Sequence, residues 1–221
     1  MRTIWMVAAG MFLLLIGMTI GYMYRVVVTN PAQVVAAQTP KQAAMKIRRL
    51  VTGHSKEGKA IVVSNTVMEA TRPTTSPGYE FHNLWGADEC LTFPDNGAQP
   101  VYRDWFAPVG GFRFQQFTFP PDNTPPPAGV DDSIISAEWD KLAPGMTAAF
   151  QKDAPGMHRS NTVDLIYVIS GRIVLELDDG VKVNLQAGDT LVQNGTCHAW
   201  HNPYDEPCRF ITTQIGARRR N

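Results

Sequence analysis

Short segments of alternating apolar and polar residues, separated by turn residues, dominate the second half of the chain. Alternation with a period of two is typical of strands that bury one face. Turn dipeptides such as Ser170-Gly171 and Asp179-Gly180 lie between the segments, and Asp-Gly favours a hairpin because both central residues of a type I′ turn have positive φ. The predicted strands cover residues 164–170, 172–177, 181–185, 190–193, 198–200 and 208–215. The short spacing leaves no room for crossover helices, so the pattern predicts an all-β sandwich or barrel.

The pattern upstream of these strands is more broken. Residues 60–64 are rich in β-branched side chains, and residues 112–119 alternate until Pro120 and Pro121 end them, so both segments are predicted strands. We expect a short helix near 41–49, a turn over 50–58 and an irregular stretch over 81–105. Residues 133–142 are consistent with either a short helix or an irregular segment.

The first residues of the chain form a long apolar run. Residues 4–24 are mostly large and apolar, and Arg2 and Arg25 bracket them. A helix of this length reaches about 30 Å, the thickness of a bilayer core. We therefore predict a single transmembrane helix over residues 1–25, a linker over 26–46 and a single-pass membrane location. A cleaved signal peptide is one alternative. A domain that begins at Met45 is another and would make the protein cytoplasmic.

Composition and charge narrow the classes of function. Lys plus Arg and Asp plus Glu each number 20, so the formal net charge is zero and no basic field indicates nucleic-acid binding. The three cysteines, Cys90, Cys197 and Cys208, lack CxxC spacing. This pattern argues against both a disulfide framework and a zinc–thiolate site.

Two polar clusters, each with a histidine, carry the candidate chemistry. The first runs from His158 through Ser160 to Asp164, with Gly171 after a further six residues. The second opens at Gly188-Asp189, passes Gly195, and continues through His198 to Asn202. In a small barrel, such clusters from distant strands meet inside one pocket.

These residues resemble the two motifs of the cupin superfamily in a degenerate form. His158 and His198 match the first and last histidines of the pattern, whereas Ser160 replaces a histidine and Asp164 replaces the glutamate. The resemblance implies a small single-domain cupin, a double-stranded β-helix or jelly-roll barrel over 112–217, with core motifs in 156–202. It also implies an N-terminal extension over 47–111 that packs on the barrel, and a homodimer.

The resemblance leaves the chemistry of the pocket with two alternatives. In the family, three histidines and a glutamate hold a divalent metal. The set His158, Asp164 and His198 would be a two-histidine, one-carboxylate site for Fe, Mn, Ni or Zn. The alternative is a pocket without a metal, in which Asp164 and His198 act as catalytic acid and base.

Aromatic residues are candidates to bind the ligand. Ser160, Trp200 and Phe114 are the predicted ligand-binding residues, and further aromatic candidates are Trp85, Trp105, Phe106, Phe112 and Phe117. Cys197 and His201 should point away from the pocket, because adjacent strand residues face opposite sides. His54, His82 and His201 are expected at the surface or in loops. The function predicted is that of an enzyme on a small, partly apolar organic molecule, and the alternative is a non-catalytic module that binds such a molecule.

Overall fold

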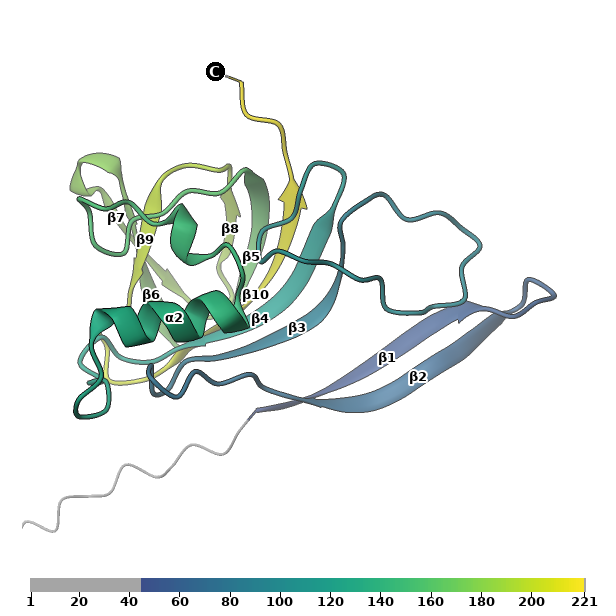
Figure 1. Ribbon diagram of the computed structural model, residues 1–221, viewed down its shortest axis with the longest axis horizontal. Coiled ribbons are helices and arrows are strands. Elements are labelled where there is room, and N and C mark those ends of the chain that lie inside the picture. The colour runs from purple at the N-terminus through teal and green to yellow at the C-terminus, as the bar shows by residue number, and fades with distance from the viewer. Residues whose placement is uncertain (1–44, 221) are drawn as a thin grey trace, which may run out of the picture. The chain divides into compact units, whose positions relative to one another are not determined.

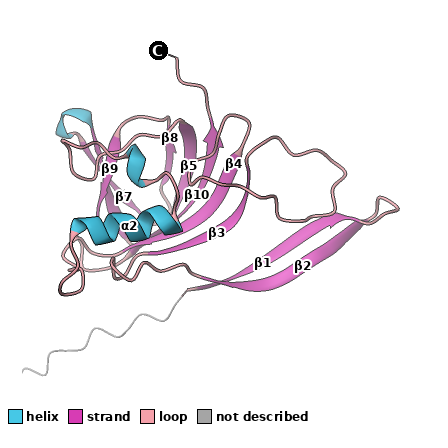
Figure 2. Ribbon diagram, in the orientation of Figure 1, coloured by secondary structure: helices cyan, strands magenta, loops and turns pink. Residues whose placement is uncertain are grey.

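Antiparallel strands are the main secondary structure of the protein (Figures 1 and 2). The structure is a computed structural model that describes residues 45–220. Each strand is short, as the alternating pattern predicts. One α-helix, α2, and two 3₁₀ turns accompany the strands in this part of the chain. The strands are β1 (Lys46–His54), β2 (Ala60–Glu69), β3 (Glu80–Ala87), β4 (Phe112–Phe119), β5 (Thr162–Ser170), β6 (Arg172–Leu177), β7 (Lys182–Gln186), β8 (Thr190–Gln193), β9 (His198–His201) and β10 (Cys208–Gly216), and α2 spans Asp132–Leu142.

Two of the three sheets enclose the core. The larger has five strands in the order β3-β4-β10-β5-β8, and the smaller has three in the order β7-β6-β9. Strands β1 and β2 form a separate two-stranded sheet. Side chains of the five-stranded and three-stranded sheets line one interior, so the predicted all-β jelly-roll barrel is confirmed. The strands predicted in the second half agree with β5 to β10 to within two residues at each end.

The apolar core follows from the alternation. Ile166 and Val168 of β5 are buried, whereas their neighbours Leu165 and Tyr167 are exposed. The inward residues pack with Ile173 of β6, which is fully buried. Burial of one such aliphatic side chain contributes about 1.5–3 kcal/mol, so this cluster holds the two sheets together.

Glycine is required at the turn between β5 and β6. Gly171 has φ of 75°, and a Cβ placed there would lie 2.4 Å from the carbonyl oxygen of Pro207. Any side chain would therefore be strained both by the backbone conformation and by contact. The predicted Asp-Gly turn is also present, since Asp179 and Gly180 have φ of 58° and 72°.

The N-terminal half differs from its prediction in two places. Residues 46–54, which were expected to form the end of a short helix and part of a turn, instead form β1. This strand pairs with β2 and has a bulge between Val51 and Thr52. The stretch expected to be irregular contains β3, which pairs with β4. A bulge between Asn83 and Trp85 shifts the register, and this interrupts the period-two pattern that would have identified the strand. Because β3 belongs to the barrel sheet, that sheet includes residues upstream of 112.

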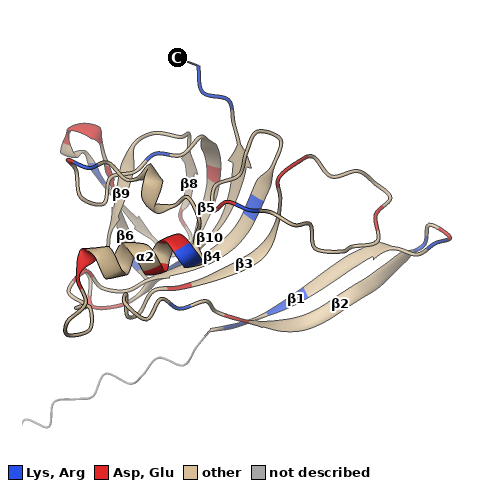
Figure 3. Ribbon diagram, in the orientation of Figure 1, with Lys and Arg blue, Asp and Glu red and all other residues tan. Residues whose placement is uncertain are grey.

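Buried Arg113 of β4 fixes the long loop between β3 and β4. Its guanidinium donates to the carbonyl oxygen of Ala87 at 2.7 Å and to Asp88 Oδ1 at 2.5 Å, and it lies over the ring of Tyr102 at 4.2 Å. The five-stranded sheet carries few other charges (Figure 3). This paired charge holds the loop that brings Trp105 to the barrel.

The predicted single-pass membrane location is corrected. Across residues 45–220, no helix has the length and apolar character needed to cross a bilayer. The apolar run predicted as a transmembrane helix, residues 1–25, and most of the predicted linker lie outside the described residues.

Candidate functional site

One cavity of about 470 Å³ opens into the barrel between the two sheets. The five-stranded sheet contributes Asp164 and Phe210, the three-stranded sheet contributes His198 and Trp200, and His158 precedes β5. His158 and His198 exchange backbone hydrogen bonds of 2.9 and 3.0 Å, so the two histidines come from chain segments that lie side by side. The fold therefore brings both predicted motifs into one pocket.

Helix α2 lies beside the barrel strands (Figure 1), and its residues Ile135 and Trp139 line this cavity. Asp131 caps its N-terminus by accepting hydrogen bonds from the backbone of the first turn. The Glu138 carboxylate accepts hydrogen bonds of 2.5–2.8 Å from the backbone N–H and hydroxyl groups of both Thr74 and Thr75. Burial alone would raise the pKa of Glu138, but these hydrogen bonds outweigh it and lower the pKa to about 2. Trp139 lines the cavity, and its indole N–H donates to Ser76 Oγ at 3.0 Å. Trp139 and Glu138 therefore attach α2 to the loop before β3.

The two pocket histidines are neutral hydrogen-bond acceptors. Their ring centroids lie 4.2 Å apart. His158 Nδ1 lies 3.1 Å from the Gly156 carbonyl oxygen, and His198 Nδ1 lies 3.0 Å from that of Thr196. A carbonyl only accepts, so each Nδ1 carries the proton and each Nε2 is left as an acceptor. Burial and the neighbouring His158 lower the pKa of His198 to about 4, and burial lowers the pKa of His158.

Asp164 lies on the five-stranded sheet and is only 8% exposed. Its Oδ1 accepts a hydrogen bond of 2.6 Å from Thr162 Oγ1, which also lies 2.6 Å from Ser160 Oγ. Burial raises the pKa of Asp164 to about 6, and the hydrogen bond from Thr162 opposes this only in part. A carboxyl group tuned this close to neutrality is suited to accept and return a proton.

The predicted metal set of His158, Asp164 and His198 does not form one cluster among the described residues. A divalent ion of the family type needs at least three close donors from one direction. Among residues 45–220, no group of three or more His, Cys, Asp or Glu side chains lies close enough to hold a metal ion. The two imidazoles lie together, but the carboxyl group is on the other sheet and is engaged by Thr162. The residues present therefore do not fit the metal that the family resemblance implies.

The predicted ligand-binding residues fall in three different places. Trp200 lines the cavity, with its ring 5.7 Å from that of His198 and 5.3 Å from that of Phe210. Ser160 is buried behind Asp164 in the hydrogen-bond chain and does not line the cavity. Phe114 does not line this cavity, because it lies on the outer face of β4, in a groove beside β1.

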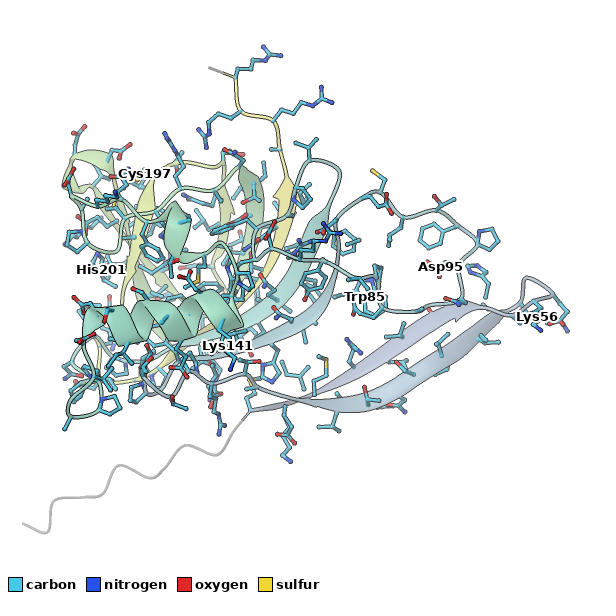
Figure 4. The ribbon with its side chains drawn as sticks, in the orientation of Figure 1. Lys56, Trp85, Asp95, Lys141, Cys197 and His201 are labelled. Atoms are coloured by element: carbon cyan, nitrogen blue, oxygen red, sulfur yellow. The ribbon has the colours of Figure 1, made fainter. Side chains whose placement is uncertain are left out.

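The other aromatic candidates divide in the same way. Trp105, Phe106 and Phe117 line the cavity, as predicted. Phe112 shares the outward parity of Phe114 on β4, and Trp85 lies in the groove beside β1, away from α2 (Figure 4). Only side chains of the parity of Phe117 reach the barrel interior from β4.

Three further residues were assigned from the sequence. His82 was expected at the surface, but it is fully buried between Gln116 Oε1 at 2.9 Å and the Met45 carbonyl oxygen at 3.1 Å. Cys197 is buried and lies outside the cavity lining, and His201 pairs with Glu176 at 2.6 Å on the outer side of the sheet (Figure 4). Cys197 and His201 thus point away from the cavity, as their strand positions predict.

Sequence reasoning missed Thr212 and Gln214 of β10, which line the cavity beside Asp164. Both have the parity of the core residue Phe210, and two polar residues at inward positions of an otherwise apolar strand were the available signal. The α2 residues Ile135 and Trp139 were also missed, since only the tertiary structure places that helix over the barrel.

Comparisons with known proteins agree with this architecture. Residues 141–213 match the family model described as "Cupin domain". The "Cupin-domain-containing oxidoreductase virC" of Hypocrea virens is 26% identical over 74% of this chain and 71% of that protein. The corresponding fogC protein of Aspergillus ruber is 26% identical over 75% of this chain and 68% of that protein. The "Oryzines biosynthesis cluster protein J" of Aspergillus oryzae is 47% identical, but the match spans only 22% of this chain and 27% of that protein.

Solved structures with related folds have low sequence identity. The cupin domain of Cnp3 from Schizosaccharomyces pombe is 9% identical, with a TM-score of 0.39, over 76% of this chain and 87% of that one. A putative ethanolamine utilization protein from Salmonella typhimurium is 11% identical, with a TM-score of 0.36, over 79% of this chain and 99% of that one.

Proposed function

From the premise that this chain belongs to the cupin superfamily, we propose that its barrel binds a small, largely apolar organic molecule and catalyses a proton transfer on it. The observation that carries the proposal is the position of Asp164. Its buried carboxyl group lines an aromatic cavity, and two neutral imidazoles line the same cavity. An isomerisation, in which one hydrogen moves between two atoms of the substrate, needs no group beyond these.

Asp164 is the proposed proton carrier. With a pKa of about 6 it is mostly ionised at pH 7 and accepts a proton from the substrate. The protonated carboxyl group then returns that proton to a second position of the same substrate, which restores the catalyst. The pKa near the working pH favours both steps, because neither protonation state of the carboxyl group is strongly disfavoured.

His158 and His198 orient the substrate in this proposal. Each Nε2 is an acceptor, so both rings favour a substrate that donates hydrogen bonds. The pKa of His198, about 4, keeps this ring neutral throughout the physiological range. Trp200 and Phe210 supply an apolar wall for the remainder of the molecule.

The names of the relatives support a role in small-molecule metabolism. One of them is named for a biosynthesis cluster, and two are named as oxidoreductases. A redox activity needs a metal or another redox group, and the donor set around His158 and His198 does not favour a metal. We therefore propose proton transfer, and retain a non-catalytic ligand-binding module as the alternative.

Deuterium exchange tests the proposal across a range of candidate substrates. The full-length protein is incubated in D₂O with a panel of small unsaturated carbonyl compounds and hydroxylated aromatic compounds, and mass spectrometry detects deuterium gained or a changed product. We expect exchange in the wild type that slows as the pH falls below about 6. Asp164→Asn should lose it, and Asp205→Asn, which changes an exposed carboxylate, should retain it.

Two results would redirect the proposal. Compounds that bind but are never exchanged or converted would favour the binding module. Stoichiometric Fe, Mn, Ni or Zn in the purified protein, lost in His198→Ala and required for turnover, would replace proton transfer by metal chemistry.

A homodimer is also proposed, on the outer face of the five-stranded sheet. Leu165, Tyr167 and Ile169 of β5 are exposed there, and Leu165 pairs with the exposed Val192 of β8. Contiguous apolar surface of this kind is typical of interfaces. Sedimentation velocity should show a dimer that Leu165→Glu dissociates, and a wild type that is monomeric at every concentration would reject it.

A further inference from the structure

The inner surface of the barrel changes from apolar to polar along β10. Phe210, Thr212 and Gln214 have the same parity and all face the cavity. Phe210 pairs with Phe117 of β4, so the row at that level is aromatic. Two residues further along, Thr212 pairs with Gln115 of β4, and at the next level Gln214 pairs with Asp164 of β5. The cavity thus has an aromatic part and a polar end.

The polar end contains hydrogen-bonding groups without partners. Thr212 is 3% exposed and Gln214 is 4% exposed. Thr212 Oγ1 and Gln214 Oε1 have no hydrogen-bond partner among the described residues. Buried polar atoms in native proteins are nearly always paired, so two such atoms on one strand, both in the cavity lining, indicate a function other than packing.

The two unpaired oxygens allow this end of the cavity to accept hydrogen bonds. Gln214 Oε1 can only accept, the Thr212 hydroxyl can accept or donate, and the Asp164 carboxyl group lies across the strand from Gln214. Directly opposed residues of paired strands lie about 5 Å apart, and alternate residues of one strand about 7 Å apart. These three groups therefore form a cluster small enough to bind one polar head group. The Nε2 atoms of His158 and His198 add further acceptors to the same cavity.

We propose that the cavity selects a hydroxylated aromatic molecule, whose hydroxyl group donates its one hydrogen to an acceptor of the cluster formed by Gln214, Thr212 and Asp164, while its ring packs against Phe117 and Phe210. This inference rests on the proposed function, since it names the substrate class of the same cavity. A carboxylate or phosphate head group is disfavoured, because it would lie beside the Asp164 carboxyl group. Methylation of the hydroxyl removes the donor and leaves these buried atoms unpaired, which is the basis of the selectivity.

A matched pair of probes separates the contribution of the ligand's hydroxyl group from that of its aromatic rings. The probes are 2-naphthol, which has a hydroxyl donor, and 2-methoxynaphthalene, in which a methyl group blocks that donor. Isothermal titration calorimetry with the full chain should show 2-naphthol binding at least about tenfold more tightly. In Thr212→Val and Gln214→Leu this preference should fall several-fold, while the affinity for 2-methoxynaphthalene is retained or improved. Thr213→Val is the matched control, because its side chain has the opposite parity on β10.

A second readout separates a ligand-binding role from a structural one. Thr212→Val replaces an unpartnered buried hydroxyl by a methyl group, so the variant without ligand should melt at a higher temperature than the wild type. A lower melting temperature would mean that the hydroxyl supports the fold, and it would overturn the inference.

The probes also distinguish failure of the inference from failure of the proposed function. Equal affinity for the two probes, unchanged in both variants, would overturn the hydroxyl selectivity and leave the ligand-binding cavity intact. Binding of neither probe at millimolar concentration would overturn both. Tight 2-naphthol binding with no proton exchange on any compound would support the inference and reject the catalytic proposal.

Discussion

Asp164→Asn should stabilise the protein at neutral pH. Burial raises the pKa of this carboxyl group from 3.8 to about 6, which corresponds to a free energy of about 3 kcal/mol. The native state therefore binds the proton more tightly than the unfolded state does. The stability associated with the protonated group is fully present below pH 3.8 and is lost as the pH rises to about 6. Since folding free energies are about 5–15 kcal/mol, the ionised group is a substantial cost at pH 7.

Asparagine removes this cost with little change of shape. Its side-chain oxygen can still accept the hydrogen bond from Thr162, but the side chain does not ionise. The difference in unfolding free energy between Asp164→Asn and the wild type should therefore grow by about 2 kcal/mol in favour of the variant as the pH rises from 4 to 7. If Asp164 is the proposed proton carrier, this gain in stability should accompany a loss of activity.

Urea unfolding followed by tryptophan fluorescence measures the difference. Unfolding free energies of the wild type and the variant are compared at several values between pH 4 and pH 8. The contributions of titratable groups other than Asp164 cancel in the difference between the two proteins. Asp205→Asn, at an exposed position, should give a difference that does not change with pH. A difference between Asp164→Asn and the wild type that is equally flat, or that grows toward acid pH, would refute the reasoning.

Other changes probe the remaining structural assignments. The pKa of His198 is lowered to about 4, so Asp164→Asn, in which the opposing carboxyl group is absent, should lose about 2–3 kcal/mol of stability between pH 7.5 and 4.5, and the double variant Asp164→Asn/His198→Gln should lack that loss in the same urea series. Gly171→Ala should cost about 2 kcal/mol or more by thermal unfolding, because it adds a backbone clash to the strain. Gly180→Ala, which has a similar φ but open space, should cost less. Glu138→Gln should weaken the attachment of α2 and speed hydrogen exchange of its backbone amides, whereas Lys141→Gln at the exposed end of the helix should not. Unchanged exchange in Glu138→Gln would show that other contacts fasten the helix.

The pKa shifts of Asp164 and His198 have opposite effects on the pH dependence of wild-type stability. As the pH falls from 6.5 to 4, Asp164 adds stability while His198 removes it. The two contributions largely cancel, so the pH dependence of each becomes visible only when the other is replaced.

The sequence by itself determined most strands of the barrel and the approximate contents of its pocket. Period-two alternation identifies β5 to β10, because the burial of one face of a strand depends only on local order. Gly171 and the Asp179-Gly180 turn were predictable for a similar reason, since positive φ is a local requirement. The same parity placed Asp164 and His198 inward and His201 outward.

Only the tertiary structure decided how these residues are grouped. On β4 the apolar positions change parity between Phe114 and Phe117, so the pattern cannot say which of the two enters the barrel. Asp164 and His198 both face inward but belong to different sheets, and the described residues contain no group of three side chains placed to hold a metal, although the motif spacing had grouped Asp164 with the two histidines as ligands. The unpaired atoms of Thr212 and Gln214 and the position of α2 likewise depend on packing between residues far apart in the chain. Facing direction is a property of one strand, whereas proximity across a barrel depends on the register and the packing of all of its strands.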